Sequence, residues 1–454
     1  MKQGWTLVKM SDIAAVKGGK RVPKGKKLSE TPTSHPYIRV ADFQDNGTVN
    51  KEDVLYVSDD VYATIKRYTI SSNDVYLSIA GTIGKSGIIP QSLEGANLTE
   101  NACKLVLKDV VYNRFMYYVT LSPQFKKQVK ALTKTSTQPK LAIGRVEQIE
   151  IPLPENIDVQ YDIVRKLDSD FAKIDRIKLN AKENLSETKA LFQSILSKGI
   201  IGDIYNDINN DSGSLLHDLR ECKTSLESER LIPKKAPIKP LNSSDSVPFS
   251  IPKNWEWCKL SEVSLIQEGA GIRKFQYRDS GVQLLTVTNI IDGVEAFVDL
   301  ERQQIFIDES EYESKYKQLT LRKGDIVCAC SGGSWGKSAI FDLDDTMILN
   351  TSTLRLRFFG DLGYNKYLYF LTKSRFFKSQ IEKQLTGMQP NFGYSHYSKV
   401  LIPLPPYSVQ VKLANIWDKL YQKISIMQSN YDQITLECDA LKEALLRKAF
   451  NDEL

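Results

Sequence analysis

The longest regular pattern of hydrophobic positions predicts a long helix near the middle of the chain. From Asp158 to Lys198 there is no glycine or proline, and apolar residues recur in steps of three and four. This stripe includes Leu167, Phe171, Ile174 and Leu185, and it is broken only at Lys178 and Thr188. A helix of this length spans about 60 Å.

A second stripe at the end of the chain is narrower and has no break. Its members alternate in steps of three and four: Trp417, Leu420, Ile424, Met427, Tyr431, Ile434, Cys438, Leu441 and Leu445. Apolar residues that repeat in this way predict a coiled-coil seam. The first long helix is its obvious partner, so we expect two long antiparallel coiled-coil-like helices.

Shorter patterns precede each long helix. "HPYIRVADF", "NDVYLSIAG" and "ACKLVLK" have the composition of strands, whereas "NRFMYYVTLSPQFKKQVKAL" has helical spacing. The "PLP" at 152–154 ends this region. The polar stretch 203–250 is expected to be a linker, with one short helix near "LLHDLRECKTSLESERL".

The same landmarks occur twice, in the same order. Asp74 and Asp325 are 251 residues apart, and so are Gln138 and Gln389, and Ile151 of "IPLP" and Ile402 of "IPLPP". Lys85 and Lys337 are 252 apart, and "GWTLVKMSDIAAVKGG" at 4–19 resembles "NWEWCKLSEVSLIQEG" at 254–269. These matches predict a tandem duplication. The expected fold is α+β: two α/β domains, 1–155 and 251–406, each followed by a long helix, 156–202 and 407–454.

Two Gly-rich stretches, "AGTIGKSG" at 80–87 and "SGGSWGKS" at 331–338, resemble a phosphate-binding loop. That loop needs four residues between its glycines, so that the backbone N–H groups can surround a phosphate. The first copy has two residues there and the second has three, and Ser331 replaces the leading glycine. The spacing therefore argues against a two-site ATPase and favours a tight turn after a strand.

Other enzyme signatures are equally incomplete. "LPPY" at 404–407 resembles the loop of amino methyltransferases, but Leu404 cannot accept a hydrogen bond from the target amine. "GAGIRK" at 269–274 lacks the third glycine of a dinucleotide-binding loop, and the three histidines have no metal-ligand spacing. We therefore expect a chain that is not catalytic and holds no metal.

Composition adds few constraints. The net charge of +6 is compatible with nucleic acid without requiring it. No run of 18 apolar residues and no signal-peptide core occur, and the six cysteines contain no C-x-x-C pair. We expect free thiols in a reducing cytoplasm.

Cationic loops at matching positions are the main candidates for nucleic-acid contact. "KGGKRVPKGKK" at 17–27 supplies Lys20, Arg21, Lys24, Lys26 and Lys27, and "GAGIRKFQYR" supplies Arg273, Lys274, Tyr277 and Arg278. Lysine and arginine in Gly/Pro loops suit phosphate neutralisation, and arginine can also read guanine. The alternative is a pair of solvated basic loops, which recurrence within the repeat makes less favoured.

Two further pairs of stretches could read DNA. "KTSTQPK" at 134–140 and "LTGMQPN" at 385–391 place Gln138 and Gln389 beside Lys140 and Asn391. Glutamine can read adenine, although it could equally support the turn. "YIRVADF" at 37–43 matches "LLTVTNI" at 284–290, where Arg39 stands against Thr286 and Asp42 against Asn289, with Thr288 beside them. Lys85 and Lys337 could contact the DNA backbone or be solvated.

The whole arrangement resembles a specificity subunit of a type I restriction–modification system. The resemblance is carried by the two "IPLP" stops, each followed by "VQ" and a long helix, by "SIAGTIGKSG" and "CSGGSWGKSAI", and by the helix endings "ALFQSILSKGIIGDI" and "ALLRKAFNDEL". It covers essentially the entire chain. The first helix ends in "SKGI", where the family often has an Ala-Phe pair as in the second copy.

The resemblance implies that each α/β domain is a target recognition domain that reads one half of an asymmetric bipartite DNA site. The two helices would form a pseudo-two-fold spacer that sets the unread gap and docks two methyltransferase subunits, with two motor–nuclease subunits beside them. S-adenosylmethionine, ATP and Mg²⁺ would belong to those partners. Two alternatives stay open: a specificity subunit of a methyltransferase without restriction partners, and a coiled-coil scaffold that binds protein.

Overall fold

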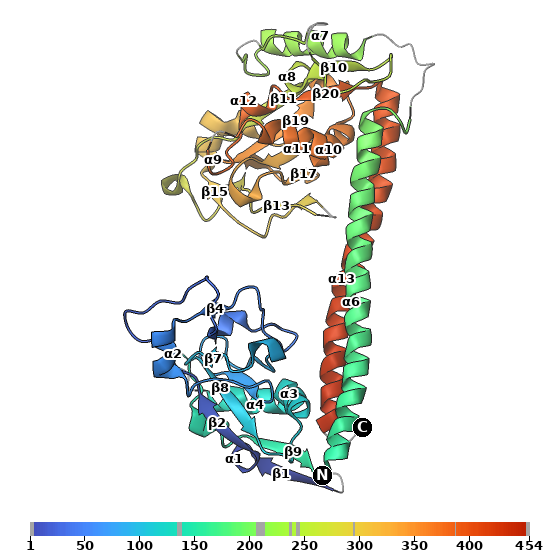
Figure 1. The fold of residues 1–454 in the computed structure, drawn as a ribbon. Helices are drawn as coiled ribbons and strands as arrows, with labels where there is room; N and C mark the ends of the chain where they lie inside the picture. Colours follow the sequence, from blue (N-terminus) through green and yellow to red (C-terminus); the bar gives the residue numbers. More distant parts are fainter. Residues whose placement is uncertain are drawn as a thin grey trace. The chain divides into compact units, whose positions relative to one another are not determined.

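The computed structural model describes residues 4–133, 139–205, 214–235, 238–241, 246–293, 296–385 and 387–450. The chain divides into two compact units. Unit 1 comprises Met1–Asn180 and Gln433–Leu454, and unit 2 comprises Ala181–Asp432. Each unit contains one α/β domain and a part of both long helices, α6 (Ile157–Ile200) and α13 (Tyr407–Phe450) (Figure 1).

The α/β domain of unit 1 consists of short elements around three small sheets. In chain order these are β1 (Trp5–Lys9), α1 (Met10–Ile13), β2 (Ala14–Gly18), β3 (Pro36–Ile38), η1 (Val40–Asp42), β4 (Leu55–Tyr56), α2 (Asp59–Ile65), β5 (Val75–Ser78), β6 (Ser86–Gly87), η2 (Gln91–Leu93), β7 (Asn97–Leu98), β8 (Ala102–Leu107), α3 (Asn113–Leu121), α4 (Pro123–Leu132), α5 (Ile143–Val146) and β9 (Glu150–Pro154).

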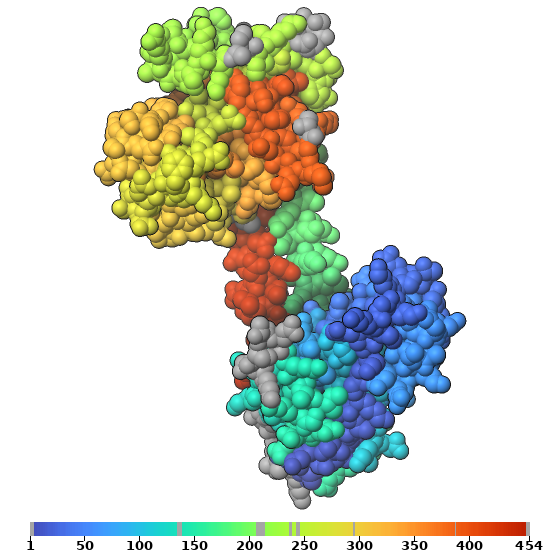
Figure 2. Space-filling model, turned by 90° about the vertical axis from the view of Figure 1, so that its left-hand side faces the viewer, coloured from blue at the N-terminus to red at the C-terminus, as the bar shows by residue number. Residues whose placement is uncertain are grey.

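The sheets of unit 1 have the orders β2-β8-β5-β6, β4-β3-β7 and β1-β9. The first is antiparallel throughout, whereas β3 and β7 run parallel in the second. We call β2-β8-β5-β6 the large sheet and β4-β3-β7 the small sheet of unit 1, and we use the same names for their counterparts in unit 2. The small sheet of unit 1 has its own buried cluster, which includes Ile38, Phe43 and Leu98. In Figure 2 the region of β3, β4 and α2 (blue) forms a lobe beside the cyan and teal helices α3 and α4.

Unit 2 contains a similar series of elements, to which α7, β13 and β14 are added. They are α7 (Leu215–Ser228), β10 (Glu256–Lys259), α8 (Leu260–Val263), β11 (Ser264–Glu268), η3 (Lys274–Gln276), β12 (Val282–Leu285), β13 (Ile290–Ile291), β14 (Phe297–Val298), β15 (Phe306–Ile307), α9 (Glu309–Glu311), η4 (Tyr312–Tyr316), η5 (Lys317–Leu319), β16 (Ile326–Ala329), η6 (Gly332–Ser334), β17 (Ser338–Ile340), β18 (Met347–Leu349), β19 (Thr353–Phe358), η7 (Phe359–Asp361), α10 (Asn365–Lys373), α11 (Arg375–Glu382), α12 (Tyr394–Tyr397) and β20 (Leu401–Leu404).

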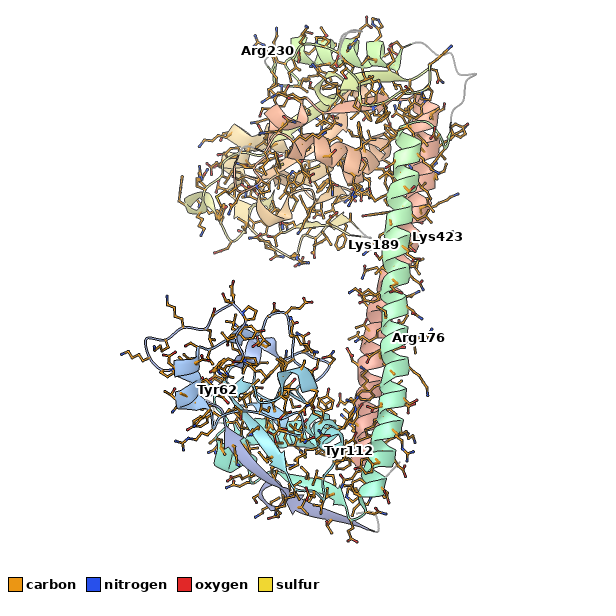
Figure 3. All side chains as sticks on the ribbon, viewed as in Figure 1. Tyr62, Tyr112, Arg176, Lys189, Arg230 and Lys423 are labelled. Carbon is orange, nitrogen blue, oxygen red and sulfur yellow. The ribbon has the colours of Figure 1, made fainter. Side chains whose placement is uncertain are left out.

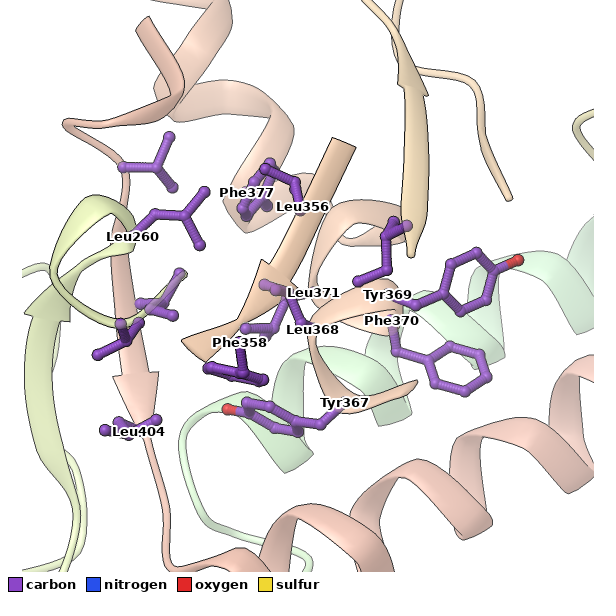
Figure 4. Close-up of a cluster of buried hydrophobic side chains, with 14 of the residues drawn as sticks. Leu260, Leu356, Phe358, Tyr367, Leu368, Tyr369, Phe370, Leu371, Phe377 and Leu404 are labelled. Carbon is purple, nitrogen blue, oxygen red and sulfur yellow. The ribbon is translucent and has the colours of Figure 1, made fainter. Parts of the chain in front are cut away.

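The sheets of unit 2 confirm the tandem duplication. Three of them, β11-β19-β16-β17, β15-β12-β18 and β10-β20, match the sheets of unit 1 strand for strand, and unit 2 adds the two-stranded sheet β13-β14. Again one pair in the small sheet, β12 with β18, is parallel. Figure 4 shows the core between the sheet and α10, where Leu356, Phe358, Tyr367 and Phe370 pack together. The mixed α/β architecture with two long helices is therefore as expected.

Two local expectations gain detail. The stretch 113–132 is helical as expected, and it forms two helices because Ser122 ends α3 and caps α4 through its hydroxyl, which accepts the N–H of Phe125. Pro123 occupies the first turn of α4, where its missing N–H costs nothing. "HPYIRVADF" is a strand only over Pro36–Ile38, since the backbone then turns into η1.

The segment between the repeats is less of a linker than its polarity suggested. The short helix expected there is α7, and its Leu216 and Leu219 are buried in the core of unit 2. Arg220 forms an ion pair with Glu262 (2.5 Å), and Lys223 donates to the backbone oxygen of Ser261 (2.9 Å). This part of the segment thus belongs to unit 2 (Figure 1).

The two long helices lie antiparallel and side by side in each unit. In unit 1 Lys178 contacts Asp439 (2.8 Å), and in unit 2 Lys189 contacts Gln428 (2.7 Å). Lys178 and Lys189 are 11 residues apart, and so are their partners, which shows that one register applies in both units. The members of the expected interface that are buried are Leu167, Ile174, Leu185, Trp417 and Ile424, while Phe171, Leu420 and Ile434 are half-buried.

Leu441 does not belong to this seam, contrary to the heptad pattern. Its side chain is 49% exposed. Lys442 takes the inward position instead, where its ammonium group pairs with Asp175 (2.5 Å) and lies 5.0 Å from the ring centre of Phe171. A helix with 3.6 residues per turn drifts from a 3.5-residue repeat, and the buried stripe continues through Leu446, Ala449 and Phe450.

Matched ion pairs inside both large sheets stabilise the duplicated fold. In unit 1 Lys104 pairs with the buried Asp74 (3.0 Å). In unit 2 the equivalent Asp325 is fully buried between Arg355 (3.1 Å) and Arg357, whose Nε donates to it (2.6 Å). Burial lowers the pKa of Arg355, and the charge of Asp325 opposes that shift. A carboxylate between two partly buried guanidinium groups is therefore needed to neutralise them.

We expect Asp325→Asn to destabilise unit 2 by about 3 to 5 kcal/mol, because it leaves buried positive charge without a counter-charge. Urea unfolding followed by tryptophan fluorescence reports mainly on unit 2, since four of the five tryptophans, Trp255, Trp257, Trp335 and Trp417, lie there. The control is Asp344→Asn, whose exposed carboxylate pairs with Lys323 (2.8 Å) and should leave the midpoint unchanged. An unchanged midpoint for Asp325→Asn would contradict this assignment.

Candidate nucleic-acid interface

Loops from two sheets of unit 1, β2-β8-β5-β6 and β4-β3-β7, meet at one edge. The last residue of β2, Gly18, pairs with Cys103 near the start of β8, and the last residue of β5, Ser78, pairs with Ala102. The small sheet ends at the same place, because the N–H of Thr99 donates to the oxygen of Ile38 (3.0 Å). We call the loops 18–35, 39–50, 79–85, 99–101 and 139–142 the loop edge of unit 1.

The Gly-rich turn is part of this edge and does not form a nucleotide cradle. It joins β5 to β6, a strand to a strand, whereas a phosphate loop leads into a helix. Gly81 and Gly84 have φ of 74° and 96°, which a residue with a side chain rarely adopts. Ala80 forms a β-bridge with Lys140, so two stretches that the sequence singled out separately lie side by side.

The same association occurs in unit 2, where we call the equivalent loops 269–281, 286–289, 330–337, 350–352 and 387–393 the loop edge of unit 2. Ser331 forms a β-bridge with Asn391, and the N–H of Gly332 donates to the oxygen of Pro390 (2.9 Å). Gln389 and Asn391 are both exposed there, and Lys337 is half-buried. The first-repeat glutamine, Gln138, lies outside the described residues. The Gln-Pro loop is thus held by its backbone against the Gly-rich turn in unit 2, which leaves the Gln389 side chain at the surface.

In the basic loop 17–27 of unit 1, some cationic side chains contact other residues of the domain and others are exposed. Nε of Arg21 donates to Glu100 (2.5 Å), and Lys26 pairs with Asp60 (2.6 Å). The hydrogen bond from Lys26 lowers the pKa of Asp60 to about 2. The Lys20 ammonium group lies 5.8 Å from the ring centre of Tyr68. Lys24 and Lys27 are exposed.

Lys85 points toward the small sheet. Its ammonium group donates to the oxygen of Phe43 (3.2 Å) and pairs with Asp45 (2.8 Å), whose side chain is 94% exposed. Lys140 is exposed on the neighbouring loop. An exposed ion pair of this kind is weak, so Lys85 can exchange Asp45 for a phosphate at little cost.

Arg39 and the residues around it were expected to recognise DNA, but most of their polar groups bind one another within a turn. Asp42 is buried, and its carboxylate accepts the backbone N–H of Arg39 (2.7 Å) and a guanidinium N–H (2.6 Å). In unit 2 Asn289 caps the same turn by accepting the N–H of Thr286 (3.1 Å), and both residues are buried. Asp42, Thr286 and Asn289 are therefore buried and support the turn, whereas Thr288 is exposed.

The hydrogen bond to Asp42 raises the pKa of Arg39, whose guanidinium group also donates to the oxygen of Asp53 (2.8 Å). Glu30, Glu52 and Asp53 line the hollow beside it. This acidic surrounding disfavours a phosphate at Arg39.

The second basic loop is open to solvent. Arg273, Lys274 and Arg278 are exposed, and Tyr277 is half-buried. The guanidinium group of Arg278 donates to the backbone oxygens of Phe275 (3.1 Å) and Tyr277 (2.9 Å), so it stabilises the loop. Phe275 and Met388 were not among the expected site residues, yet their side chains are 81% and 102% exposed. Their apolar character inside two otherwise polar loops is the feature of the sequence that could have identified them.

A buried lysine at the border with the long helices was also missed. Lys373 pairs with Asp292 and donates to the oxygen of Ser338 (2.6 Å). Burial lowers its pKa, although the charge of Asp292 opposes that shift. Lys373 and Lys189, which is labelled in Figure 3, line a cavity of about 800 Å³ between the domain and the long helices of unit 2.

Among the residues that the structure describes, no group of three or more His, Cys, Asp or Glu residues could hold a metal ion. No helix in the described ranges has the length and apolar character to cross a membrane. Within those ranges, the exposed lysine, arginine and amide side chains of the loop edge in each unit are the candidates for contact with nucleic acid.

Comparison with known proteins agrees with the duplication. The family model of the type I restriction modification DNA specificity domain matches residues 2–187 and again residues 252–436. The MjaVIII specificity subunit of Methanocaldococcus jannaschii is 25% identical over 444 residues, which is 95% of this chain and 89% of that subunit. The EcoAI specificity subunit of Escherichia coli is 26% identical over 268 residues, 57% of this chain and 44% of that subunit.

Solved structures show the same fold. One of them comes from a study of complex assembly and conformational transition of the type I R-M system. It matches with a TM-score of 0.70 at 16% identity, and the match covers 100% of this chain and 99% of that chain. The HsdS subunit from Thermoanaerobacter tengcongensis has a TM-score of 0.53 at 16% identity, with 100% of this chain and 98% of that chain covered.

Removal of two lysines from the loop edge of unit 1 should weaken binding to duplex DNA regardless of sequence. A plot of log affinity against log salt has a negative slope, to which each phosphate contact contributes about 0.9 in magnitude. We expect the double variant Lys85→Ala, Lys140→Ala to make this slope shallower by about 2. The measurement is fluorescence anisotropy of the full chain, assembled with its modification subunits, over a salt series. Lys108→Ala, which follows β8 at the opposite end of the strand, is the matched control and should leave the slope unchanged.

Proposed function

Because this chain belongs to the type I restriction–modification DNA specificity family, we propose that each unit reads one half of a bipartite DNA site. The observation that supports this most directly is the repeated loop edge. Each unit presents loops from two sheets at one end, with exposed cationic and amide side chains on them. Cations position DNA through its phosphates, and amide and guanidinium groups can read base edges.

The two half-sites should differ in sequence. The strand order of the sheets that carry the loop edge is the same in both units, but the loops are not. Lys140 stands where unit 2 has Asn391, and the loop "KGGKRVPKGKK" stands where unit 2 has "GAGIRKFQYR". Since base contacts come from side chains, different side chains on matching sheets imply different bases. The target is therefore expected to be asymmetric.

Specificity subunits of type I systems are non-catalytic, and we propose that the chemistry is carried out by partner subunits. Two methyltransferase subunits would use S-adenosylmethionine to methylate adenine, and two motor–nuclease subunits would use ATP and Mg²⁺. A specificity subunit that serves a methyltransferase alone would have the same DNA-reading role, and the neighbouring genes distinguish these two cases.

We further propose that α6 and α13 act as a ruler that sets the unread gap. In unit 1 the domain is fastened to α6, because Arg114 donates from Nε and Nη2 to Asp168 (2.8 and 2.7 Å) and Tyr118 donates to the same carboxylate. The ring of Tyr112, which is labelled in Figure 3, lies tilted against that of Tyr161 of α6, with ring centres 4.6 Å apart. In unit 2 Lys366 pairs with Asp418 of α13 (2.7 Å).

Buried glutamines at the start of each long helix add to this fixation. Gln160 accepts the N–H of Tyr112 (2.9 Å) and donates to the oxygen of Val110 (2.9 Å). Gln410 accepts the N–H of Tyr364 (2.9 Å) and donates to Pro405 (2.9 Å). A domain held in this way to a stiff helix keeps its distance along that helix, which is what a ruler requires.

The proposed function is tested by mapping methylated bases in cells that express this chain with its modification subunit. We expect methylation at one asymmetric site made of two short specific parts and a fixed unread gap. Methylation that requires only one continuous sequence would contradict the two-reader proposal. A scaffold that binds only protein predicts no new methylation and no salt-dependent retention on DNA.

A matched insertion tests the ruler. Lys189 of α6 contacts Gln428 of α13, and the helices are antiparallel, so Leu185 lies opposite the turn at Asp432. Seven residues are inserted at each of these two places. Because seven residues are one heptad, the apolar seam is preserved. Seven residues lengthen a helix by about 10 Å, so the gap should grow by about three base pairs while both half-sites keep their bases. The control replaces exposed residues of the same turns by alanine without a change in length, and it should leave the gap unchanged. Altered half-site bases would contradict the ruler.

A further inference from the structure

Arg21 at the loop edge of unit 1 combines exposure with a fixed orientation. Its side chain is 78% exposed, yet its Nε donates a charge-assisted hydrogen bond to Oε1 of Glu100 at 2.5 Å. Within the described part of the chain, its terminal guanidinium nitrogens have no further protein partner. The planar end of the side chain is therefore available to a ligand.

Glu100 is itself fixed in the turn between β7 and β8. Its carboxylate is 27% exposed and accepts the hydroxyl of Thr99 at Oε2 (3.1 Å). Burial opposes ionisation of Glu100, yet hydrogen bonds from Arg21, from the backbone and from Thr99 keep its pKa below the usual range. It is thus an anionic acceptor that stays in one place.

The backbone that carries Arg21 is locked to the same turn. The N–H of Gly19 donates to Ala102 (3.0 Å), the N–H of Lys20 donates to Leu98 (2.8 Å), and the Tyr37 hydroxyl donates to the oxygen of Lys20 (2.8 Å). A Cβ at Gly19 would lie 2.1 Å from the oxygen of Thr99, so only glycine allows this approach. Both ends of the Arg21–Glu100 pair therefore start from one rigid piece of backbone.

We propose that Arg21 is a specificity-determining residue that reads a guanine through O6 and N7, and that Glu100 is the positioning residue that orients it. The inference rests on the proposed function. Arginine offers two parallel N–H donors that match the guanine edge in the major groove. Because Glu100 already immobilises the side chain, less rotational freedom is lost on binding, and a wrong base leaves the fixed donors without partners.

Neighbouring cations differ from Arg21 in this respect. Lys24 and Lys27 are exposed lysines with point charges, which suits phosphates. The guanidinium group of Arg39 is engaged by Asp42 and by the oxygen of Asp53. Of these cations, Arg21 is the one that pairs a fixed Nε with open terminal nitrogens.

The second repeat has a different residue at the Glu100 position. Thr351 stands 251 residues after Glu100, and its hydroxyl donates to the oxygen of Ala270 (3.0 Å). Threonine has no charge with which to orient an arginine. The guanine that we assign to Arg21 therefore belongs only to the half-site read by unit 1.

The test uses the full chain assembled with its modification subunits and a duplex that carries the methylation-mapped site. Competitor duplexes exchange each G·C pair of the site in turn. We expect Arg21→Ala to lose about 5- to 150-fold of discrimination at one G·C pair of one half-site, and to keep discrimination elsewhere. Arg21→Lys, which retains charge but not the fork, should lose most of it at the same pair.

The positioning role of Glu100 has a separate readout. Glu100→Ala should relax specificity at that same base pair although Arg21 is present, and Glu100→Gln, which still accepts a hydrogen bond from Nε, should restore part of it. Lys27→Ala in the same loop is the matched control and should weaken all duplexes equally, with a smaller salt slope.

The outcomes separate this inference from the proposed function. If Arg21→Ala weakens all duplexes equally and leaves every base preference intact, Arg21 contacts phosphate and the inference is overturned, while the two-reader proposal stands. If the wild-type assembly recognises no bipartite site, the proposed function fails first, and the guanine assignment fails with it.

Discussion

Burial of the apolar stripes of α6 and α13 is the constraint on which the rest of this structure depends. Neither helix covers its stripe alone, and in each unit the stripe merges with the core of the α/β domain. In unit 2 Trp417 is fully buried among Tyr367 and Phe370 of α10. In unit 1 Leu167 and Phe450 share a cluster with Phe115 of α3. Removal of these aromatic and aliphatic surfaces from water is the largest favourable contribution available to such a fold.

This shared core explains why some positions allow so little variation. A Cβ at Gly199 would lie 2.5 Å from the Trp417 ring, so the close approach of α6 to α13 in unit 2 requires glycine. The sequence "SKGI", which departs from the family pattern at the end of the first helix, places this glycine at the contact. The departure is thus a local packing solution for a large tryptophan on the opposite helix.

Polar groups at these junctions are paired rather than avoided. Arg114 with Asp168 in unit 1 and Lys366 with Asp418 in unit 2 bind helix α3 or α10 to a long helix at matching places. Asp74 and Asp325 neutralise cations inside the large sheets. Because a buried charge without a partner is costly, the pairs inside the large sheets fix the strands that carry them. The pairs at the long helices are partly exposed and act mainly through the geometry of their contacts. That rigidity is what lets variable loops be displayed on a constant frame.

Much of this organisation follows from the sequence by itself. Local rules are enough for the long helices, because their periodicity extends over dozens of residues, and for the duplication, because landmarks recur at 251 or 252 residues. The Gly-rich turns, the Gln-Pro loops and the basic loops were also recognisable, since glycine, proline and clustered lysine mark surface turns. What they have in common was not recognisable, because they are far apart in sequence and meet only where Ala80 pairs with Lys140 and Ser331 with Asn391.

Tertiary structure alone decided which side chains are free to act. Asp42 and Asn289 have the chemistry of recognition residues but are buried as caps, and Leu441 fits the heptad but is exposed, while Lys442 packs over Phe171. α7 has the composition of a linker yet joins the core of unit 2. Arg21 was one of several cations in a basic loop until the fold placed Glu100, 79 residues away, against its Nε. Periodicity and composition report local preference, whereas burial and pairing depend on what the rest of the chain brings to each residue.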